Sequence, residues 1–428
     1  MTSPRKPAGT VATVAETGTT PQPGTDDGFA GESEFAARVE GFLSDHCSSI
    51  GDPGDDGGET QGLARTRAFQ GALVDAGLAG LTYPTHLGGA GLTPLHQEVF
   101  TRVSAGWRLP DGPLAISHGM CLPMLGQFGT EEQKARYLPD NISGRAIWCQ
   151  MFSEPGAGSD VAGLSMRAVR DGDEWILDGQ KVWTSGAHYC DFGIVVARTD
   201  PTLPKHQGLS MFIVDMRAPG IEVRPLVQIS GARNFNEVFF SDARIPAANL
   251  LGEVNQGWNL AVSMLMFERV SIGAGGGALN ARRGPELAAL ARALGRASDP
   301  VIRQGLADLH IREEIKEYIG QRIRSSVAAG RVPGPEGSIA KLNGAVLARR
   351  TRDLAMSIIG TAGQAWDDGD PSSDVAARWS SFCISAAGVS IAGGTDEVQR
   401  NIIGERVLGL PREPDPFKGA PWQDIPRN

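Results

Sequence analysis

The sequence predicts a mostly helical α+β protein in which an antiparallel β-barrel or sandwich separates two helical regions. Apolar residues recur at helical spacing in the first part of the chain, and short β-rich runs bounded by turn residues fill the middle. Helical spacing then returns from Gln256 onward. This order contains no strand–helix–strand alternation, so a doubly wound nucleotide-binding domain is not expected.

The chain of 428 residues is long enough for several packed units. Its first residues are rich in Pro, Gly, Thr and Ala and carry too little apolar surface to offset the entropy of folding. We expect a disordered extension over 1–30, an N-terminal helical domain over 31–147, a β-domain over 148–254, a C-terminal helical domain built on a four-helix bundle over 255–412, and a tail over 413–428.

Each region is predicted from its own pattern. Phe35, Val39 and Leu43 lie at helical spacing near the start of the N-terminal domain. In the middle region, Glu174–Leu177 follows a turn and alternates as a strand does; further β-rich runs are Phe192–Val196, Leu209–Val214 and Glu237–Phe240.

Two features define the start of the C-terminal domain. The apolar run Trp258–Ile272 predicts a long buried helix. Asp299-Pro300 is a good N-cap and first-turn pair for a second helix, because Asp accepts hydrogen bonds from free backbone N–H groups and Pro needs none.

Composition excludes several classes of protein. The net charge is −9 and the basic residues are dispersed, so a basic face for nucleic acid is not expected. No run approaches the ~20 apolar residues of a membrane span, and Met1–Gly28 lacks the apolar segment of a secretory signal. Five distant cysteines fit reduced thiols, and no cysteine or histidine spacing suggests zinc. We expect a cytoplasmic protein that needs no metal.

The segment Phe152–Asp160, reading F-S-E-P-G-A-G-S-D, carries the clearest functional signal. An expected strand over Ala146–Phe152 runs into its Pro-Gly turn. Gly156 and Gly158 allow the backbone to approach a planar or phosphorylated ligand closely, and the neighbouring serines add hydroxyl groups. The alternative is a capped β-turn, which composition alone would favour.

Other stretches agree with this segment in a family-specific order. Together they resemble the acyl-CoA dehydrogenases, in which the first segment is the flavin- and substrate-binding signature. The matching stretches are Gly88–Gly91, Phe128–Lys134 with Tyr137–Pro139, Gly179–Ser185, Asn236–Pro246 and Gly394–Ile403, and the resemblance spans residues 31–412. It implies one FAD per subunit, dehydrogenation of an acyl-CoA to the trans-2-enoyl-CoA with hydride transfer to the flavin, and an electron-transferring flavoprotein as acceptor.

The resemblance also implies site residues by position. Trp183 is expected to flank the flavin, although a tryptophan on a strand can equally belong to the core. Ser159, Arg269 and Gly393 are expected to contact the substrate. The expected cofactor-binding residues are Phe152, Ser153, Gly158, Ser159, Trp183, Thr184, Ser185, Thr395 and Glu397.

The carboxylate that removes the α-proton departs from the commonest family pattern. Many members carry it directly before the Gly-Thr of the C-terminal loop, where this chain has Gly393. A second branch, with the isovaleryl-CoA and long-chain enzymes, places it in a Glu-Arg pair on the helix after the β-domain. Glu268-Arg269 lies there, after the apolar run Met264–Phe267. A lone acid in such a run requires an explanation, so Glu268 is the predicted base, and Gly393 could offer its N–H to the thioester oxygen.

Two alternatives for the base stay open. Glu268 could be a structural residue that pairs with a distant partner, since adjacent helical residues point about 100° apart and Arg269 is therefore poorly placed. Asp396 or Glu397 could instead serve as the base.

The expected assembly is a homotetramer or homodimer, and an α₂β₂ pair with a paralogue is the alternative. The family often contacts the neighbouring subunit's FAD through Gln-x-x-Gly-Gly and Arg-x-x-Phe-Gly stretches, where this chain has Ser357–Gly363 and Ala281–Gly284. These departures resemble family members that work as unequal pairs of subunits, so the α₂β₂ pair stays open as the alternative.

Two competing functions also stay open. The same fold could run oxygen chemistry, as in nitroalkane oxidases and flavin monooxygenases, or the chain could be a non-catalytic partner that completes another subunit's FAD site. Straight, branched, aromatic, steroid-side-chain and carrier-bound acyl groups are all compatible with the sequence.

Overall fold

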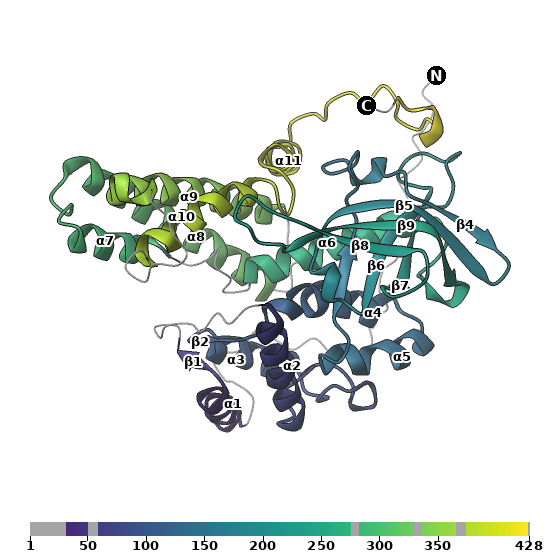
Figure 1. Ribbon diagram of the computed structural model, residues 1–428, viewed down its shortest axis with the longest axis horizontal. Helices are drawn as coiled ribbons and strands as arrows, with labels where there is room; N and C mark the ends of the chain where they lie inside the picture. Colours follow the sequence, from purple (N-terminus) through teal and green to yellow (C-terminus); the bar gives the residue numbers. More distant parts are fainter. Residues whose placement is uncertain (1–30, 50–58, 275–281, 329–334, 365–373, 427–428) are drawn as a thin grey trace, which may run out of the picture.

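The computed structural model describes residues 31–49, 59–274, 282–328, 335–364 and 374–426, so the expected disordered extension over 1–30 lies outside it. N-terminal helices, a central sheet and C-terminal helices follow one another along the chain (Figure 1). The predicted fold class is confirmed.

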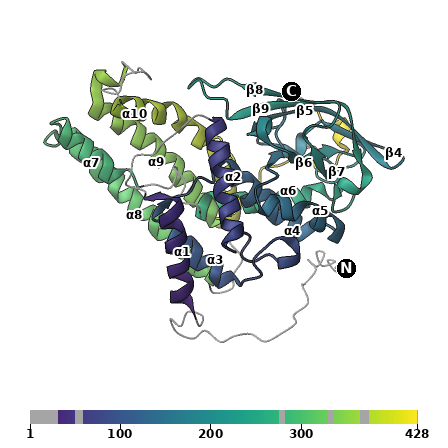
Figure 2. The same cartoon turned by 60° about the horizontal axis from the view of Figure 1, so that its bottom comes forward.

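The N-terminal helices lie on one side of the sheet (Figure 2), and their apolar residues share a core with it. Phe35, Val39 and Leu43 are the buried residues of the first helix, as their spacing predicts. Thr130 and Gln133 form a capping box at the start of the last one, and the Gln133 amide also donates to two carbonyls at the end of the β-domain, each at 2.8 Å. The helices are α1 (Glu32–His46), α2 (Glu59–Asp75), α3 (Pro94–Ser104), α4 (Leu122–Phe128) and α5 (Glu131–Ile142), with a small pair of strands, β1 (Ser48–Ser49) and β2 (Trp107–Arg108).

The middle domain is an eight-stranded sheet in the order β10-β7-β6-β4-β5-β9-β8, with β3 beside β6. Most pairs are antiparallel, but β3 and β4 both pair with β6 in parallel, so the sheet is mixed. The β4–β5 hairpin separates β3 from β6, so no tight turn forces them to run antiparallel. The strands are β3 (Trp148–Met151), β4 (Arg167–Asp171), β5 (Glu174–Ser185), β6 (Phe192–Arg198), β7 (Leu209–Asp215), β8 (Ile221–Leu226), β9 (Phe235–Pro246) and β10 (Leu250–Leu251).

Side-chain alternation gives the sheet two apolar faces. Along β6, Ile194 and Val196 join the core shared with the N-terminal helices, whereas Val195 and Ala197 join a second core inside the β-domain. A strand buried on both faces reads as a continuous apolar run, which is the pattern of β6.

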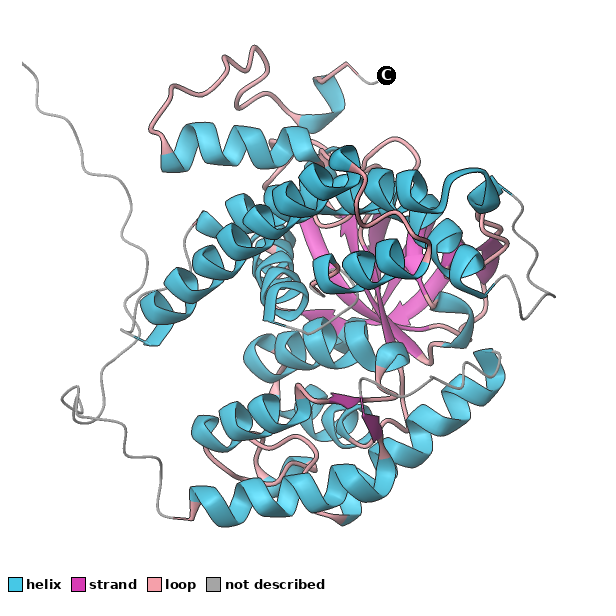
Figure 3. Ribbon diagram, turned by 90° about the vertical axis from the view of Figure 1, so that its left-hand side faces the viewer, coloured by secondary structure: helices cyan, strands magenta, loops and turns pink. Residues whose placement is uncertain are grey.

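The C-terminal helices form a bundle beside the sheet (Figure 3), and α6 joins the two (Figure 1). The predicted apolar helix Trp258–Ile272 is confirmed as α6, whose residues Leu260, Ala261 and Met264 enter the core shared with the sheet. Asp299 caps α8 as predicted, since its Oδ1 accepts from Val301 N at 2.9 Å. The helices are α6 (Gly257–Ala274), α7 (Gly284–Ala293), α8 (Pro300–Ala328), α9 (Glu336–Ile359), α10 (Asp374–Ser385) and α11 (Asp396–Ile402). Across the described ranges, every helix is too short or too polar to traverse a bilayer.

The C-terminal tail leaves α11 and packs against the β-domain (Figure 1). Trp422 is its anchor: the side chain is buried, and its Nε1 donates to Gly163 O at 3.3 Å. The guanidinium of Arg198 lies 4.3 Å from the centre of the indole ring. The backbone N of Trp422 donates to Leu203 O at 2.9 Å. Only the end of the tail is buried, because Arg412–Gly419 is exposed.

Replacing Trp422 by Ala is expected to release the tail without unfolding the domains. Replacing a buried tryptophan by alanine destabilises the packed state by about 3–5 kcal/mol. The few other contacts of the tail cannot compensate for that loss. Limited trypsin digestion should then cut rapidly after Arg412 and Lys418, while the thermal midpoint of the remaining protein stays unchanged. Phe417→Ala, at a side chain that is 41% exposed, is the matched control. Equal cleavage of the two variants would contradict the anchoring role.

Candidate active site

The segment Phe152–Asp160 continues β3 into a tight turn that is fastened to β5. The backbones of Glu154 and Ala157 exchange two hydrogen bonds of 3.0 Å, which close the turn. Val182 N donates to Ser153 O at 2.9 Å and joins the turn to β5. The segment therefore has a defined position beside the strand that carries Trp183.

Glycines in this turn are not required by packing within the chain. A Cβ added to Gly156 or Gly158 would have no protein atom within 4 Å. Neither residue has a φ in the left-handed region that favours glycine. Small residues that neither packing nor backbone conformation requires are suited to the close approach of another molecule.

A buried ion pair lies directly beneath the turn. Lys181 is fully buried, and its Nζ donates to Glu154 Oε1 at 2.8 Å and to Phe152 O at 3.0 Å. The Glu154 carboxylate also accepts from Ser165 N at 2.6 Å and Met166 N at 2.9 Å. Burial alone would raise the pKa of Glu154, but the Lys181 charge and these hydrogen bonds outweigh it and lower that pKa. The carboxylate is therefore ionised at neutral pH, as a buried acid with this many donors must be.

The next part of β5 is a bulge that presents Trp183. The pairing with β9 shifts between Lys181 and Thr184, so one extra residue is accommodated there. Trp183 has a φ of 60°, a left-handed conformation that costs an L-residue about 1–2 kcal/mol. The residue is 61% exposed, and its ring makes an edge contact with Phe235 at 5.9 Å between ring centroids. A strained backbone that displays a large aromatic ring is typical of a binding site.

The hydroxyl group of Thr184, beside Trp183, is a second indication of a ligand-binding position. The residue is buried, and its hydroxyl oxygen has no hydrogen-bond partner among the described residues. A buried hydroxyl without a partner costs about 1–3 kcal/mol, which a ligand oxygen or nitrogen would recover. An exposed aromatic face, an available hydroxyl and an open glycine turn together fit a planar cofactor of the flavin type.

Glu268 and Gly393 face each other at the junction of α6 with the loop before α11. A Cβ added to Gly393 would lie 3.8 Å from Glu268 Oε1. The Glu268 carboxylate therefore lies at van der Waals distance from the point where a side chain at position 393 would begin. Arg269 follows Glu268 on α6, but its side chain lies outside the described residues.

The loop that holds Gly393 is fixed by its own chain. Gln399 is buried, and its Nε2 donates to Gly393 O at 3.0 Å and to Gly394 O at 3.2 Å. Thr395 caps α11 by accepting from Val398 N at 3.3 Å. The Thr395 hydroxyl can still donate to another group.

The two alternative bases are poorly suited to the task. Asp396 Oδ2 accepts from Arg349 at 2.8 Å, and Lys341 lies 3.6 Å from Oδ1. Burial opposes ionisation of Asp396, but these cations outweigh it and lower the pKa of the carboxyl, which makes it a weaker base. Glu397 is exposed and pairs with Arg400 at 3.1 Å. The geometry leaves Glu268 as the preferred candidate.

The predicted site residues thus fall into two groups. Phe152, Ser153, Trp183 and Thr184 gather on the β-domain, with Ser185 next on β5, while Gly158 and Ser159 lie on the exposed part of the turn. Glu268 and Gly393 face each other where α6 meets the C-terminal loop, and Thr395 and Glu397 follow Gly393 at the start of α11. α6 runs between the sheet and the bundle (Figure 1).

Residues that support the site are harder to find from sequence. Lys181 and Glu154 stand inside recognisable motifs, yet their pairing across the fold is visible only in the structure. The one sequence signal is that Lys181 occupies a strand otherwise lined by inward apolar residues such as Trp175 and Leu177. Gln399 gives no comparable signal.

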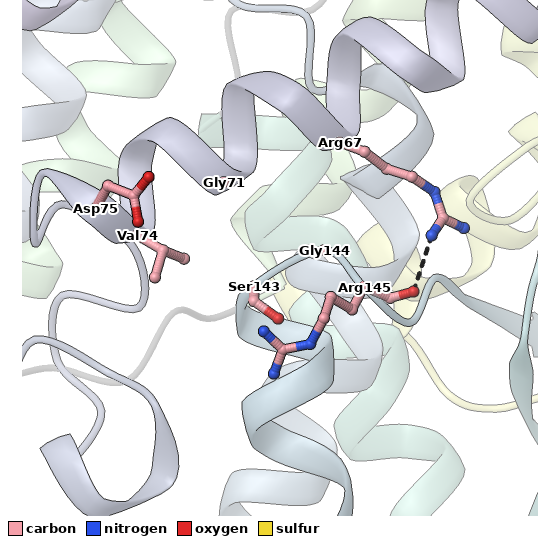
Figure 4. Close-up of a pocket in the computed structure, with 7 residues that line it drawn as sticks. All are labelled: Arg67, Gly71, Val74, Asp75, Ser143, Gly144 and Arg145. Atoms are coloured by element: carbon pink, nitrogen blue, oxygen red, sulfur yellow. Dashed lines mark hydrogen bonds between the residues drawn. The ribbon is translucent and has the colours of Figure 1, made fainter.

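A separate pocket lies between α2 and the loop after α5 (Figure 4). Its two arginines are already engaged: Arg67 donates to Arg145 O at 2.9 Å, and Arg145 pairs with Asp140 at 2.7 Å. None of the predicted site residues lines this pocket. The described part of the chain also contains no cluster of three or more His, Cys, Asp or Glu that could hold a metal.

Comparison with known proteins agrees with this arrangement. Sequence profiles match in chain order: acyl-CoA dehydrogenase N-terminal domain over 31–145, middle domain over 149–243 and C-terminal domain over 255–408. "Acyl-CoA dehydrogenase IpdE1" of Mycobacterium tuberculosis is 38% identical over 390 residues, covering 89% of this chain and 98% of that protein. A mitochondrial isovaleryl-CoA dehydrogenase of Pongo abelii is 34% identical, covering 58% of this chain and 60% of that protein.

Solved structures show the same relationship. A structure described as "Tcur3481-Tcur3483 steroid ACAD" is 30% identical with a TM-score of 0.75, covering 89% of this chain and 98% of that one. The ChsE4-ChsE5 complex from Mycobacterium tuberculosis is 28% identical with a TM-score of 0.70, covering 91% of this chain and all of that one.

The fold and these relatives together define an oxidoreductase of the flavoprotein class. More specifically, the chain belongs to the acyl-CoA dehydrogenase family.

Gly393→Ala is expected to slow acyl-CoA-dependent flavin reduction beyond its effect on stability. The left-handed φ of 65° costs about 1–2 kcal/mol for any L-residue, and the new methyl group would stand 3.8 Å from the Glu268 carboxylate. Gly409→Ala is the matched control, because Gly409 has a φ of 70° with no atom near its added Cβ. Urea unfolding should show similar losses for both variants, while stopped-flow reduction slows only for Gly393→Ala. Equal slowing in both would contradict the assignment.

Proposed function

We propose that this protein catalyses FAD-dependent α,β-dehydrogenation of an acyl-CoA to the trans-2-enoyl-CoA, with Glu268 removing the α-proton. The observation that carries the proposal is the 3.8 Å separation between Glu268 Oε1 and the Cβ position at Gly393. α6 and the loop before α11 thus approach each other at this point, and the carboxylate there comes from Glu268 on α6.

FAD, when bound, supplies the acceptor for the hydride that leaves the β-carbon. Trp183, Thr184 and Ser153 are the residues proposed to hold its ring system, on the support of the exposed indole and the unpartnered Thr184 hydroxyl. Gly158, Ser159 and Ser185 are proposed to contact the cofactor from the turn and from β5, and Thr395 and Glu397 from the C-terminal loop.

Glu268 is proposed to take the α-proton and hold it on its carboxylate. Met264 is buried, and Leu265 and Phe267 pack against the same core, so Glu268 lies on a helix anchored by its apolar neighbours. The thioester oxygen gains negative charge as the proton leaves, so a fixed N–H donor stabilises the reaction. Gly393 is proposed to supply that N–H, because Gln399 holds its carbonyl and so fixes the peptide.

The acyl group is proposed to be steroid-derived. Support comes from a solved relative described as a steroid ACAD, which is 30% identical over most of both chains. The two electrons released are proposed to pass to an electron-transferring flavoprotein, as in the family at large. Five free cysteines agree with a reducing cytoplasm as the compartment.

The assembly is proposed to be an α₂β₂ pair with a paralogue, in preference to a homotetramer or homodimer. Support comes from two related solved structures whose descriptions pair two names, "Tcur3481-Tcur3483 steroid ACAD" and the ChsE4-ChsE5 complex. Arg282, at the place where the family often reaches the neighbouring subunit's cofactor, pairs instead with Glu314 of its own chain. Such a residue is not available to a phosphate across the interface.

Glu268→Gln is expected to abolish proton abstraction while leaving the fold intact. The amide has the same shape but is not a base, and a positioned general base contributes about 10²–10⁴-fold. Anaerobic stopped-flow should therefore show flavin bleaching slowed by that factor, with unchanged FAD content. Glu253→Gln, an exposed acid just before α6, is the matched control. Bleaching of Glu268→Gln at the parent rate would remove Glu268 as the base.

A panel of acyl-CoAs tests the substrate class. Steroid-derived CoA thioesters are expected to bleach the flavin faster than straight-chain, branched or aromatic ones, because relatives with this fold are described as steroid enzymes. Admitting air afterwards tests the acceptor: slow reoxidation is expected of a dehydrogenase, and rapid reoxidation would favour the oxidase or monooxygenase alternative. Preference for a straight-chain thioester would contradict the steroid assignment.

A further inference from the structure

Trp183 is held in a conformation that its own sequence disfavours. Its φ of 60° lies in the left-handed region, and its ring is 61% exposed. Backbone strain of this kind persists only where the surrounding structure enforces it. The neighbours of the bulge must therefore carry the restraint.

The first restraint lies on the N-terminal side of the bulge. Lys181 is 0% exposed, and its ammonium group donates to Phe152 O at 3.0 Å and to Glu154 Oε1 at 2.8 Å. Glu154 is held in turn by Ser165 and Met166. These bonds are directional, and they fix the bulge relative to the glycine turn.

The second restraint lies on the C-terminal side. Asn236 is fully buried on β9, and its Nδ2 donates to Thr184 O at 3.0 Å. Its Oδ1 lies 3.0 Å from His188 Nδ1, and His188 Nε2 lies 2.5 Å from Glu59 Oε1 on α2. The amide of Asn236 is thereby held in one orientation by a chain of contacts that reaches the N-terminal helices.

A purely structural role would not require these groups. Well-packed apolar side chains are often as stabilising as a buried ion pair, and β5 and β9 already pair through their backbones on both sides of the bulge. What the polar groups add is a fixed direction for two specific carbonyl groups, those of Phe152 and Thr184. Both belong to residues that are expected to bind the cofactor.

We propose that Lys181 and Asn236 are positioning residues that clamp the β5 bulge from both sides and so set the orientation of Trp183 and Thr184 toward the flavin. This inference rests on the proposed function. It assigns a role to residues that cannot touch a ligand themselves, because both are fully buried.

The test separates stability from positioning. Lys181→Met alone would leave the Glu154 carboxylate buried without its partner, so it is combined with Glu154→Gln to keep the site neutral. Asn236→Ala tests the other side without changing charge. Arg244→Met is the matched control, because Arg244 lies on β9 and its side chain makes surface ion pairs with Asp171 on β4 and Glu174 on β5.

Three measurements are compared for each variant: the unfolding midpoint of the apoprotein, the dissociation constant of FAD, and the visible absorption and midpoint potential of the bound flavin. We expect Lys181→Met/Glu154→Gln and Asn236→Ala to weaken FAD binding at least about tenfold, or about 1.4 kcal/mol, and to shift the flavin spectrum and potential. Arg244→Met should change neither. The shift in spectrum and potential is the readout that a loss of stability alone would not produce.

The outcomes distinguish the two proposals. If both variants fold and bind FAD with parental affinity, spectrum and potential, the clamp is overturned. If the double variant does not fold, Asn236→Ala decides, since parental flavin properties in that variant overturn the clamp and altered ones support it. If the parent protein itself binds no FAD, alone or with its paralogue, the proposed function fails instead.

Discussion

The buried pair of Lys181 and Glu154 is the interaction on which the rest of the β-domain site depends. Both charged groups are buried away from water, so hydrogen bonds and opposite charges at fixed positions must stabilise them. Lys181 meets that need by donating to a carbonyl of the turn as well as to the carboxylate. The turn, the bulge and the strand pair β5–β9 are therefore one unit, and the exposed Trp183 is a consequence of it.

The second constraint joins this unit to the helical half of the chain. α6 shares a core with the sheet and carries Glu268 to the loop that holds Gly393. A glycine at 393 leaves room for a carboxylate from another element, so the proposed proton abstraction depends on residues from two elements rather than on one motif. Gln399 Nε2 donates to Gly393 O and thereby fixes the orientation of the Gly393 peptide.

The sequence predicted what depends on local pattern or on family motifs. α6 and the Asp299 cap follow from periodicity and hydrogen-bonding chemistry, and the fold class follows from the order of elements. The parallel pairing of β3 with β6, the docking of Trp422 and the partners of Lys181 could not be predicted. Each depends on residues distant in sequence, and no local property of either partner specifies the other. The site roles of Trp183 and Thr395 remain predictions.

The anchored tail also affects how the sheet and the helical bundle are connected. The chain crosses from the sheet to the bundle along α6 and returns through the tail to Trp422 (Figure 1). The protein is thus a closed loop whose last link is non-covalent. The segment between Leu408 and Trp422 therefore connects the bundle to the sheet a second time, and this connection depends on the noncovalent contacts of a single tryptophan.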